Sequence, residues 1–352
     1  MSFISSRSGR REFLSRCLAI GCGTTLFRSG HAADSPNLLT PETRTAIQAG
    51  LKWLEQQQHP NGSFGSVARY QGNVGIAGLA GLAMLSSGST PERGPYGQAI
   101  SRVIDYLISC CSPTGYIIEP DSQVESPMYG HGFATTFLAE ALGMSDRDEL
   151  SKVVRKAVAL ILQTQNDEGG WRYFPVPKDA DASVTVCQLM ALRAARNTGI
   201  SVSKETIDRG VQYIEKCQNP DGGFRYRIFD AQESRFARSA AALVALYTSG
   251  VHEGATLEKG RAYLRQFTPG VRAVYDQDFY YYGHYYAAQA AWHAGGDLWD
   301  SWYPAIRTEL LQRQSSDGRW ADTREWFGSE YSTAMALIVL QTPNHLLPIF
   351  DR

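Results

Sequence analysis

The sequence has few cysteines, no long apolar run and no excess of charge of one sign. It contains six cysteines in 352 residues, and those beyond residue 33 show neither the spacing of a zinc framework nor a disulfide pattern. No apolar run approaches the roughly 18 residues that span a bilayer. The formal net charge is −1, which does not favour a nucleic-acid partner. The sequence therefore predicts no metal, no transmembrane segment and no nucleic-acid binding.

The alternation of apolar and polar residues that marks a half-buried strand is also missing. A helical hairpin recurs instead, with a period of roughly 50 residues, which is typical of repeat architectures. In each copy an amphipathic helix ends in Gln, followed by three residues, Gly, one residue and Trp or Phe, and then an apolar helix rich in Gly and Ala. Four copies are well kept and two are degraded. The glycines of the phrase are Gly62, Gly115, Gly169, Gly222, Gly270 and Gly318.

Six such hairpins predict an all-α fold, an (α/α)6 toroid of six helix-hairpin repeats. The amphipathic helices would form an outer ring and the apolar helices an inner ring, because a helix that is apolar all round must be buried. The turn glycine supplies positive φ, the Gln amide satisfies free carbonyls at the helix end, and the aromatic side chain packs over both. The inner helices are predicted at 75–85, 133–142, 184–195, 239–247, 285–294 and 332–340.

The repeat runs without a linker, so residues 34–352 are predicted to form a single domain. The apolar tail 346–350 is expected to help close the ring. An open superhelix is the alternative, but such solenoids need polar capping repeats, and neither end unit has that character.

The first 33 residues differ from the rest and predict an export signal. Arg10 and Arg11 precede a mildly apolar stretch, 17–27, and a run of small residues that ends at Ala33. This order is typical of a twin-arginine signal peptide and indicates a periplasmic protein. Lipid anchoring through Cys22 is the alternative.

The Gln-x-x-x-Gly-x-aromatic phrase, in a six-fold helical repeat over about residues 40–350, resembles the terpenoid cyclase and protein prenyltransferase superfamily, which includes prenyltransferase and squalene oxidase repeat proteins. The resemblance implies the toroid fold. Triterpene cyclases of this superfamily carry an Asp-x-Asp-Asp motif at the start of an inner helix, where a carboxylic acid protonates the substrate. Here Asp179 and Asp181 match and Ala182 replaces the last acid. The resemblance thus implies Asp181 as an acid, and helix capping is the alternative role.

Protein prenyltransferases of the superfamily hold zinc through two triplets on inner helices. The matching triplets here are Tyr282-Gly283-His284 and Tyr331-Ser332-Thr333, in which only His284 is a potential ligand. One histidine cannot hold zinc. No metal and no cofactor are therefore predicted.

The starts of the inner helices converge at one end of such a ring, and the residues there are rich in polar and aromatic side chains. The triplet Tyr-Gly-His occurs twice, at Tyr129 and at Tyr282. These side chains predict a cavity lined by aromatic residues. The predicted catalytic residues are Asp181, His284 and His131. The predicted substrate-binding residues are Tyr129, Asp179, Arg235, Asp278, Tyr282, Glu330 and Tyr331.

Three functions fit this sequence. The first is a terpenoid-cyclase-like or prenyltransferase-like toroid whose cavity takes an isoprenoid, a membrane lipid or another small apolar ligand, with Asp181 as the acid. The second is a polysaccharide lyase or glycosidase on the same fold, because Tyr, His, Arg and carboxylates in a cleft perform acid–base chemistry on glycans. The third is a binding or scaffold toroid without catalysis. A closed apolar cavity favours the first, an open polar groove the second and a filled cavity the third.

Overall fold

The computed structural model describes residues 38–274, 279–321 and 326–350. The unit from Leu38 onward is compact and has its own core. The twin-arginine sequence, Cys22 and Asp278 lie outside the described residues. Within them the chain forms twelve α-helices, and its β-type pairings are isolated bridges.

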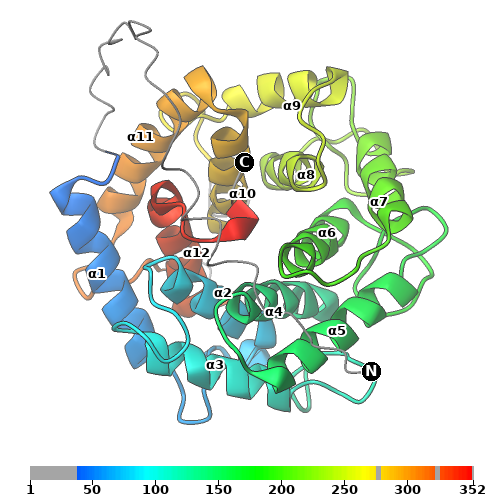
Figure 1. Ribbon diagram of the computed structural model, residues 1–352. Coiled ribbons are helices and arrows are strands. Elements are labelled where there is room, and N and C mark those ends of the chain that lie inside the picture. Colours follow the sequence, from blue (N-terminus) through cyan, green and yellow to red (C-terminus); the bar gives the residue numbers. More distant parts are fainter. Residues whose placement is uncertain (1–37, 275–278, 322–325, 351–352) are drawn as a thin grey trace, which may run out of the picture. The chain divides into compact units, whose positions relative to one another are not determined.

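The helices form two concentric layers (Figure 1). The outer layer consists of α1 (Pro41–Gln56), α3 (Gly97–Ser109), α5 (Asp148–Gln163), α7 (Lys204–Lys216), α9 (Ala255–Arg265) and α11 (Gly296–Arg313). The inner layer consists of α2 (Val74–Leu85), α4 (Pro127–Leu142), α6 (Ala182–Asn197), α8 (Phe236–Thr248), α10 (Tyr280–Ala294) and α12 (Ser329–Gln341). A short 3-10 helix, η1 (Ala68–Tyr70), precedes α2.

The ring is closed. Each inner helix contacts the next one along the chain, and α12 returns to contact α2. Across the same seam, the outer helix α1 contacts the outer helix α11 and the inner helix α12. The predicted all-α toroid of six helical hairpins is confirmed, and the open superhelix is excluded.

The Gln of the repeated phrase joins neighbouring hairpins. The Gln165 side-chain amide donates one hydrogen bond to the carbonyl of its own turn and another, of 2.9 Å, to Thr206 O in α7. Gln314 repeats this arrangement at the seam, where its amide donates to Gly318 O at 2.8 Å and to Ala46 O in α1 at 2.9 Å. The sequence predicted only the bond at the helix end. In the four hairpins that keep the Gln, the second bond ties the turn to the next outer helix.

The turn glycines are required by close backbone contacts as well as by positive φ. Gly222 has a φ of 88°. A Cβ atom on it would lie 2.3 Å from the carbonyl oxygen of Lys259 in α9. Gly318 docks in the same way on Ala49 of α1, so the last turn of the chain packs on the first helix.

Two inner helices begin at least five residues earlier than the sequence predicted. Helix α4 starts at residue 127 rather than 133, and α10 starts at residue 280 rather than 285. Glycines in the first turns weaken the helix signal. They are present because the inner helices approach closely: a Cβ on Gly75 would lie 2.9 Å from the Cα of Gly130. The helix starts therefore carry both functional side chains and backbone contacts.

The C-terminal tail covers the end of the ring where the inner helices finish. It contains η3 (Thr342–Asn344) and η4 (Pro348–Phe350), and η4 contacts α6. The indole N–H of Trp292, near the end of α10, donates a 2.9 Å hydrogen bond to Phe350 O. Leu347 and Ile349 are buried. The tail thus covers one end of the ring (Figure 1), which leaves the other end, where the inner helices begin, for a site.

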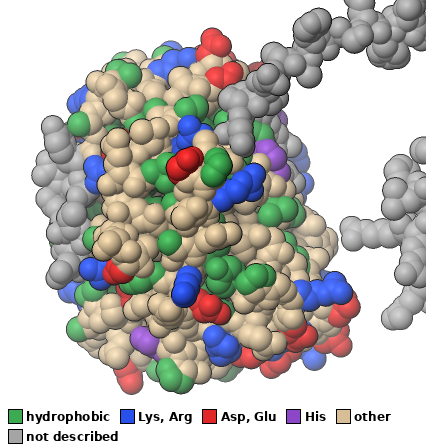
Figure 2. Space-filling view, turned by 90° about the vertical axis from the view of Figure 1, so that its left-hand side faces the viewer, with side chains coloured by type: hydrophobic (Ala, Val, Ile, Leu, Met, Phe, Trp, Pro, Cys, Tyr) green, Lys and Arg blue, Asp and Glu red, His purple; other side chains and the backbone are tan. Residues whose placement is uncertain are grey.

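The outer face is mixed in character. Figure 2 views the ring from the α1 and α11 side, where charged side chains of both signs are scattered among apolar ones. Across the described ranges, no helix is long and apolar enough to cross a membrane.

Candidate functional site

A cavity of about 940 Å³ lies at the end of the ring where the inner helices begin. We call this end the mouth. Side chains from the first two turns of the inner helices, from the loops that precede them and from the outer helix α9 line the cavity, and most of the larger ones are aromatic. The aromatic lining residues are Tyr70, Tyr129, Phe133, Tyr173, Tyr226, Phe236, Tyr263, Phe267, Phe279, Tyr282, Phe327 and Tyr331.

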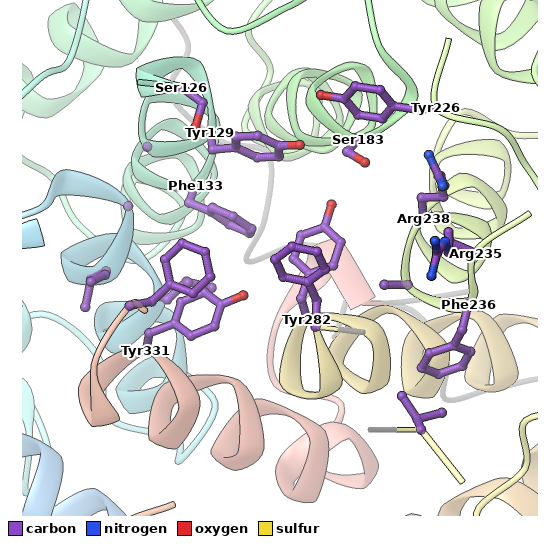
Figure 3. Close-up of a pocket in the computed structure, with 18 of the residues that line it drawn as sticks. Ser126, Tyr129, Phe133, Ser183, Tyr226, Arg235, Phe236, Arg238, Tyr282 and Tyr331 are labelled. Carbon is purple, nitrogen blue, oxygen red and sulfur yellow. The ribbon is translucent and has the colours of Figure 1, made fainter. Parts of the chain in front are cut away.

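The cavity has an aromatic side and a basic side (Figure 3). The hydroxyl groups of Tyr129, Tyr226 and Tyr282 point toward a common region near Ser183, at the start of α6. Phe133 forms part of the wall below Tyr129 in this view. A ligand in this space would contact ring faces and a small set of hydroxyl groups.

Sequence reasoning missed several hydroxyl-bearing lining residues, among them Tyr173 and Tyr226. Tyr173 and Tyr226 each stand two residues after the aromatic residue of the repeated phrase, in the third and fourth hairpins. Their hydroxyl oxygens are 2.5 Å apart, so the two loops meet at the cavity wall. The repeated order aromatic-Arg-Tyr is the signal that would have identified them.

The basic side is formed by arginines on and near α8. Arg235 and Arg238 lie together on one wall in Figure 3, and Arg272 lines the cavity as well. Arg238 is half-buried beside the ring of Tyr226, with 5.6 Å from its guanidinium carbon to the ring centroid. Burial lowers the pKa of Arg238, while the charge of Glu233 opposes this effect. A cation held in a partly dry wall favours an anionic or electron-rich ligand group.

Asp181 caps α6 and is fully buried. Its Oδ1 atom accepts a 2.9 Å hydrogen bond from the backbone N–H of Val184, and its own N–H donates to Trp171 O at 3.0 Å. Its Oδ2 atom has no hydrogen-bond partner among the described residues. Burial raises the pKa of Asp181 to about 6, against the opposing effects of the Val184 N–H and the charge of Arg172. Asp181 therefore caps a helix, and its raised pKa keeps it partly protonated at a pH near 6.

Asp181 is not among the residues that line the cavity, but it lies close behind its wall. The pKa values of Tyr129, Tyr226 and Tyr282 are raised, first by burial and in addition by the negative charge of Asp181. Its partner in the predicted motif, Asp179, is exposed and pairs with Arg172 at 3.3 Å.

The two predicted histidines pack between the inner and outer layers. The backbone N–H of Ile117 donates to Nδ1 of His131 at 3.2 Å, and burial lowers the pKa of His131 to about 4. His284 lies against Tyr280 and against Trp302 of α11, with ring centroids 4.5 and 6.0 Å apart. Burial lowers the pKa of His284 to about 3. Neither histidine lines the cavity, so their catalytic roles stay sequence predictions.

The remaining predicted residues can also be sorted by whether they line the cavity. Tyr129, Arg235, Tyr282 and Tyr331 line the cavity. Glu330 is buried at the start of α12 without lining it. In the described part of the chain, no group of three His, Cys, Asp or Glu side chains could hold a metal ion.

Comparison with known proteins supports this architecture. The family model of the prenyltransferase alpha-alpha toroid domain matches residues 32–267. A drimenyl diphosphate synthase from Streptomyces showdoensis is 24% identical over 185 residues, which cover 52% of this chain and 33% of that protein. A second one, from Streptantibioticus cattleyicolor, is 24% identical over 188 residues, again 52% of this chain and 33% of the relative. The match thus spans a third of the length of these curated relatives.

Similar solved structures share the fold. An α-1,6-mannanase from Salegentibacter sp. HEL1_6 superposes with a TM-score of 0.64 at 9% identity, covering 85% of this chain and 98% of that one. A type II terpene cyclase from Scytonema, in complex with geranylgeranyl dihydroxybenzoate, gives a TM-score of 0.58 at 16% identity over 87% and 98% of the two chains. At such identities the likeness concerns the fold alone. The family-model match and the closed ring of six helical hairpins together show that this chain belongs to the prenyltransferase alpha-alpha toroid domain family.

Proposed function

We propose that this protein is an exported, terpenoid-cyclase-like toroid that binds an isoprenoid or similar apolar ligand in its aromatic cavity, with Asp181 as the acid that starts a cyclase-type reaction. The observation that carries the proposal is a buried, protonatable carboxyl directly behind the tyrosine wall of that cavity. Two relatives are named drimenyl diphosphate synthases, and a reaction of that kind agrees with this proposal.

The size and lining of the cavity suit a ligand of this class. A volume of about 940 Å³ is at the upper end of the roughly 300–1,000 Å³ that small-molecule sites occupy. Aromatic rings bury apolar chains, and their faces stabilise positive charge. A carbocation formed in the cavity would face the rings of Tyr129, Phe133 and Tyr282. The basic wall at Arg235 and Arg238 is suited to an anionic end of the same ligand, such as a diphosphate.

The chemistry proposed for Asp181 is proton donation to a carbon–carbon double bond. The π electrons of that bond form the new C–H bond, and the adjacent carbon becomes a cation that a second double bond attacks. Water takes up a proton lost from carbon and the Asp181 carboxylate regains a proton from water, so the net reaction is an isomerisation. A pKa of about 6 leaves part of Asp181 protonated near neutral pH. The hydroxyl of Tyr226, which lines the cavity, is our candidate for carrying the proton across the wall.

A glycosidase is the second candidate, because the mannanase shares the fold. Glycosidases place two carboxylates on either side of the scissile bond. Among the described lining residues the acidic side chain is Glu233, which forms an ion pair with Arg235. The rest of the lining is aromatic, aliphatic, small, basic or uncharged polar, so a second carboxylate is missing among the described lining residues and the isoprenoid ligand is favoured over a glycan.

Direct binding separates these candidates. We expect geranylgeranyl diphosphate to bind the protein and manno-oligosaccharides not to, when both are titrated by calorimetry. Tyr282→Ala, in the cavity wall, should weaken isoprenoid binding at least about tenfold through lost contact area. Phe174→Ala is the matched control, because Phe174 is exposed and does not line the cavity. Binding of the glycan alone would replace the proposal by the glycosidase, and binding of neither would leave the scaffold function.

Export is tested separately. Changing Arg10 and Arg11 together to Lys should retain the protein in the cytoplasm, as measured by cell fractionation. Normal periplasmic levels of this variant would refute twin-arginine export. Labelling with a lipid precursor, lost in Cys22→Ala, would instead indicate a lipid anchor.

A further inference from the structure

The charged side chains of the cavity lining all come from one part of the ring. They belong to the start of α8, to the loop before it and to the segment that follows α9, and among the described lining residues they are Glu233, Arg235, Arg238 and Arg272. Glu233 forms an ion pair with Arg235, and nearby Asp230 pairs with Arg227 outside the lining. The described lining therefore carries more positive than negative charge here, and we call this side of the cavity the basic end.

The opposite side of the cavity has no charged side chain among the described lining residues. The inner helices form a closed ring of six, so α2 stands across the axis from α8. Ile76 and Leu79 of α2 and Phe133 of α4 line the cavity there. Phe327 and Tyr331, just before and within α12, add two rings whose centroids are 4.8 Å apart. We call this side the uncharged end, and Figure 3 shows Phe133 and Tyr331 across the cavity from the arginines.

Asp181 lies behind the wall between these two ends and is closer to the basic end. It caps α6, which contacts α8 directly, whereas α4 separates α6 from α2. Tyr226 connects the two helices. Its backbone oxygen accepts a 2.8 Å hydrogen bond from the N–H of Ala182, the residue after Asp181, and its ring centroid lies 5.6 Å from the guanidinium carbon of Arg238. An anionic group bound at Arg238 would thus be separated from the acid by the side chain of Tyr226.

We propose that the ligand is a long-chain isoprenoid diphosphate that binds with its diphosphate at the basic end and its chain extending past Asp181 into the uncharged end. The guanidinium group of Arg238 matches phosphate oxygens in pairs, and the rings of the uncharged end bury hydrocarbon. In this orientation Asp181 faces a double bond in the half of the chain next to the diphosphate. The inference rests on the proposed isoprenoid ligand and adds its orientation and its site of protonation.

The reverse orientation is disfavoured by the cost of burying charge. It would place the diphosphate against Ile76 and Leu79, where the described lining offers no cation. In the proposed orientation the proton of Asp181 and the π electrons of the near double bond form the new C–H bond, and the adjacent carbon becomes the cation. A neighbouring double bond attacks that cation. The double bonds that lie in the uncharged end stay intact in the product, as does the bond to the diphosphate.

Titrations with two chain lengths test the orientation. Geranyl diphosphate, half as long as geranylgeranyl diphosphate, would leave the uncharged end unfilled, so we expect it to bind at least about a hundredfold more weakly. Arg238→Gln should weaken binding of both ligands at least about tenfold and abolish competition by inorganic diphosphate. Leu79→Phe, which fills the uncharged end, should weaken binding of the longer ligand alone. Arg227→Gln is the matched control for charge, because Arg227 is exposed in the same loop and does not line the cavity.

Melting temperatures show whether each variant folds. Tyr331→Trp fills the uncharged end from a half-buried position and takes the place of Leu79→Phe if that variant does not fold. The orientation is overturned if the two ligands bind equally tightly, if Arg238→Gln weakens neither, or if filling the uncharged end weakens both alike. A wild-type protein that binds neither ligand would overturn the isoprenoid ligand itself, and the orientation with it.

Turnover in D2O locates the protonated bond. The product formed from geranylgeranyl diphosphate should carry deuterium on a carbon in the half of the chain next to the diphosphate, as measured by NMR. Deuterium on the terminal unit at the far end would overturn the orientation while leaving the cyclase-type reaction in place. A protein that binds both ligands as expected without converting them would overturn that reaction and support the binding orientation.

Discussion

The two ends of the ring are built differently. At the mouth, the turn glycines of five hairpins press on the backbone of the next outer helix, as Gly222 does on Lys259. At the tail end, Gly199, Gly250 and Gly254 also have positive φ, but a Cβ on any of them would meet no atom within 4 Å. Five of the six mouth turns are thus fixed by contact with an outer helix, whereas the tail-end turns at Gly199, Gly250 and Gly254 have open space around them.

This difference places rigidity where the candidate site lies. The turn of the third hairpin ends at Trp171. The backbone N–H of Trp171 donates a hydrogen bond to Thr185 Oγ1 of α6, and its carbonyl oxygen accepts one from the backbone N–H of Asp181. The repeated phrase thus orients the candidate acid as well as closing the ring. A well-fixed first turn of this kind is what a site needs in order to hold groups at set distances.

The largest expected effect comes from adding a methyl group to a mouth turn. Gly222→Ala should lower the free energy of unfolding by about 4 kcal/mol, because positive φ is combined with a clash against a backbone carbonyl. Gly250→Ala, at a similar φ of 94° in open space, should cost only about 1 kcal/mol. Urea unfolding of both variants measures the difference. Equal losses would show that the two ends do not differ in this way.

The fifth mouth turn sharpens the same comparison. Its repeat has lost the Gln and the aromatic residue, and Gly270 has open space around it despite a φ of 86°. Gly270→Ala should therefore behave like the tail-end variant. If Gly270→Ala lowered the free energy of unfolding as much as Gly222→Ala does, positive φ alone would explain both losses.

The second effect concerns the buried charge at the mouth. The folded-state pKa of Asp181, about 6, is above its unfolded value of about 4. The folded protein then binds this proton more tightly between pH 4 and 6, so the contribution of Asp181 to stability falls as pH rises through that window. Relative to Asp181→Asn, which caps α6 equally well, the wild-type protein should lose about 2 to 3 kcal/mol from pH 4 to pH 7. Urea unfolding of both proteins at a series of pH values measures this difference, and parallel curves would mean that the pKa is not raised.

The smallest expected loss of stability tests whether the junction at the seam is as strong as a junction within the ring. Gln314→Ala at the seam and Gln165→Ala within the ring each remove two hydrogen bonds and should each cost about 2 kcal/mol. Thermal unfolding compares them. A seam variant with no effect would indicate that the ring is open in solution.

The sequence predicts the fold well because the fold is repeated. Helix period, turn glycine and Gln recur in four good copies, so errors in single copies do not change the architecture. The starts of α4 and α10 were misplaced because glycines such as Gly130 lower helix propensity, and the close approach to Gly75 that requires them is a tertiary contact.

The candidate site is predicted less well, because a motif gives position along a helix but not direction around it. Tyr129 and His131, two residues apart, differ by about 200° around the helix. If Tyr129 faces the cavity, His131 faces the outer layer, and the same holds for Tyr282 and His284. The sequence therefore identified the correct turns of the helices. The angular positions of the tyrosines and histidines around the helix axis could have shown that only the tyrosines face the cavity.

The most direct test of the central claim is product formation by the Asp181→Asn variant. The wild-type protein and the variant are each incubated with geranylgeranyl diphosphate, and products are analysed by mass spectrometry while binding is measured in parallel. We predict a cyclic product of unchanged mass from the wild-type protein, and from the variant similar binding with turnover reduced by about 10² to 10⁴, the usual contribution of a general acid. Equal turnover by the two proteins would contradict the role of Asp181, and a wild-type protein that binds the substrate without converting it would contradict the cyclase-type reaction.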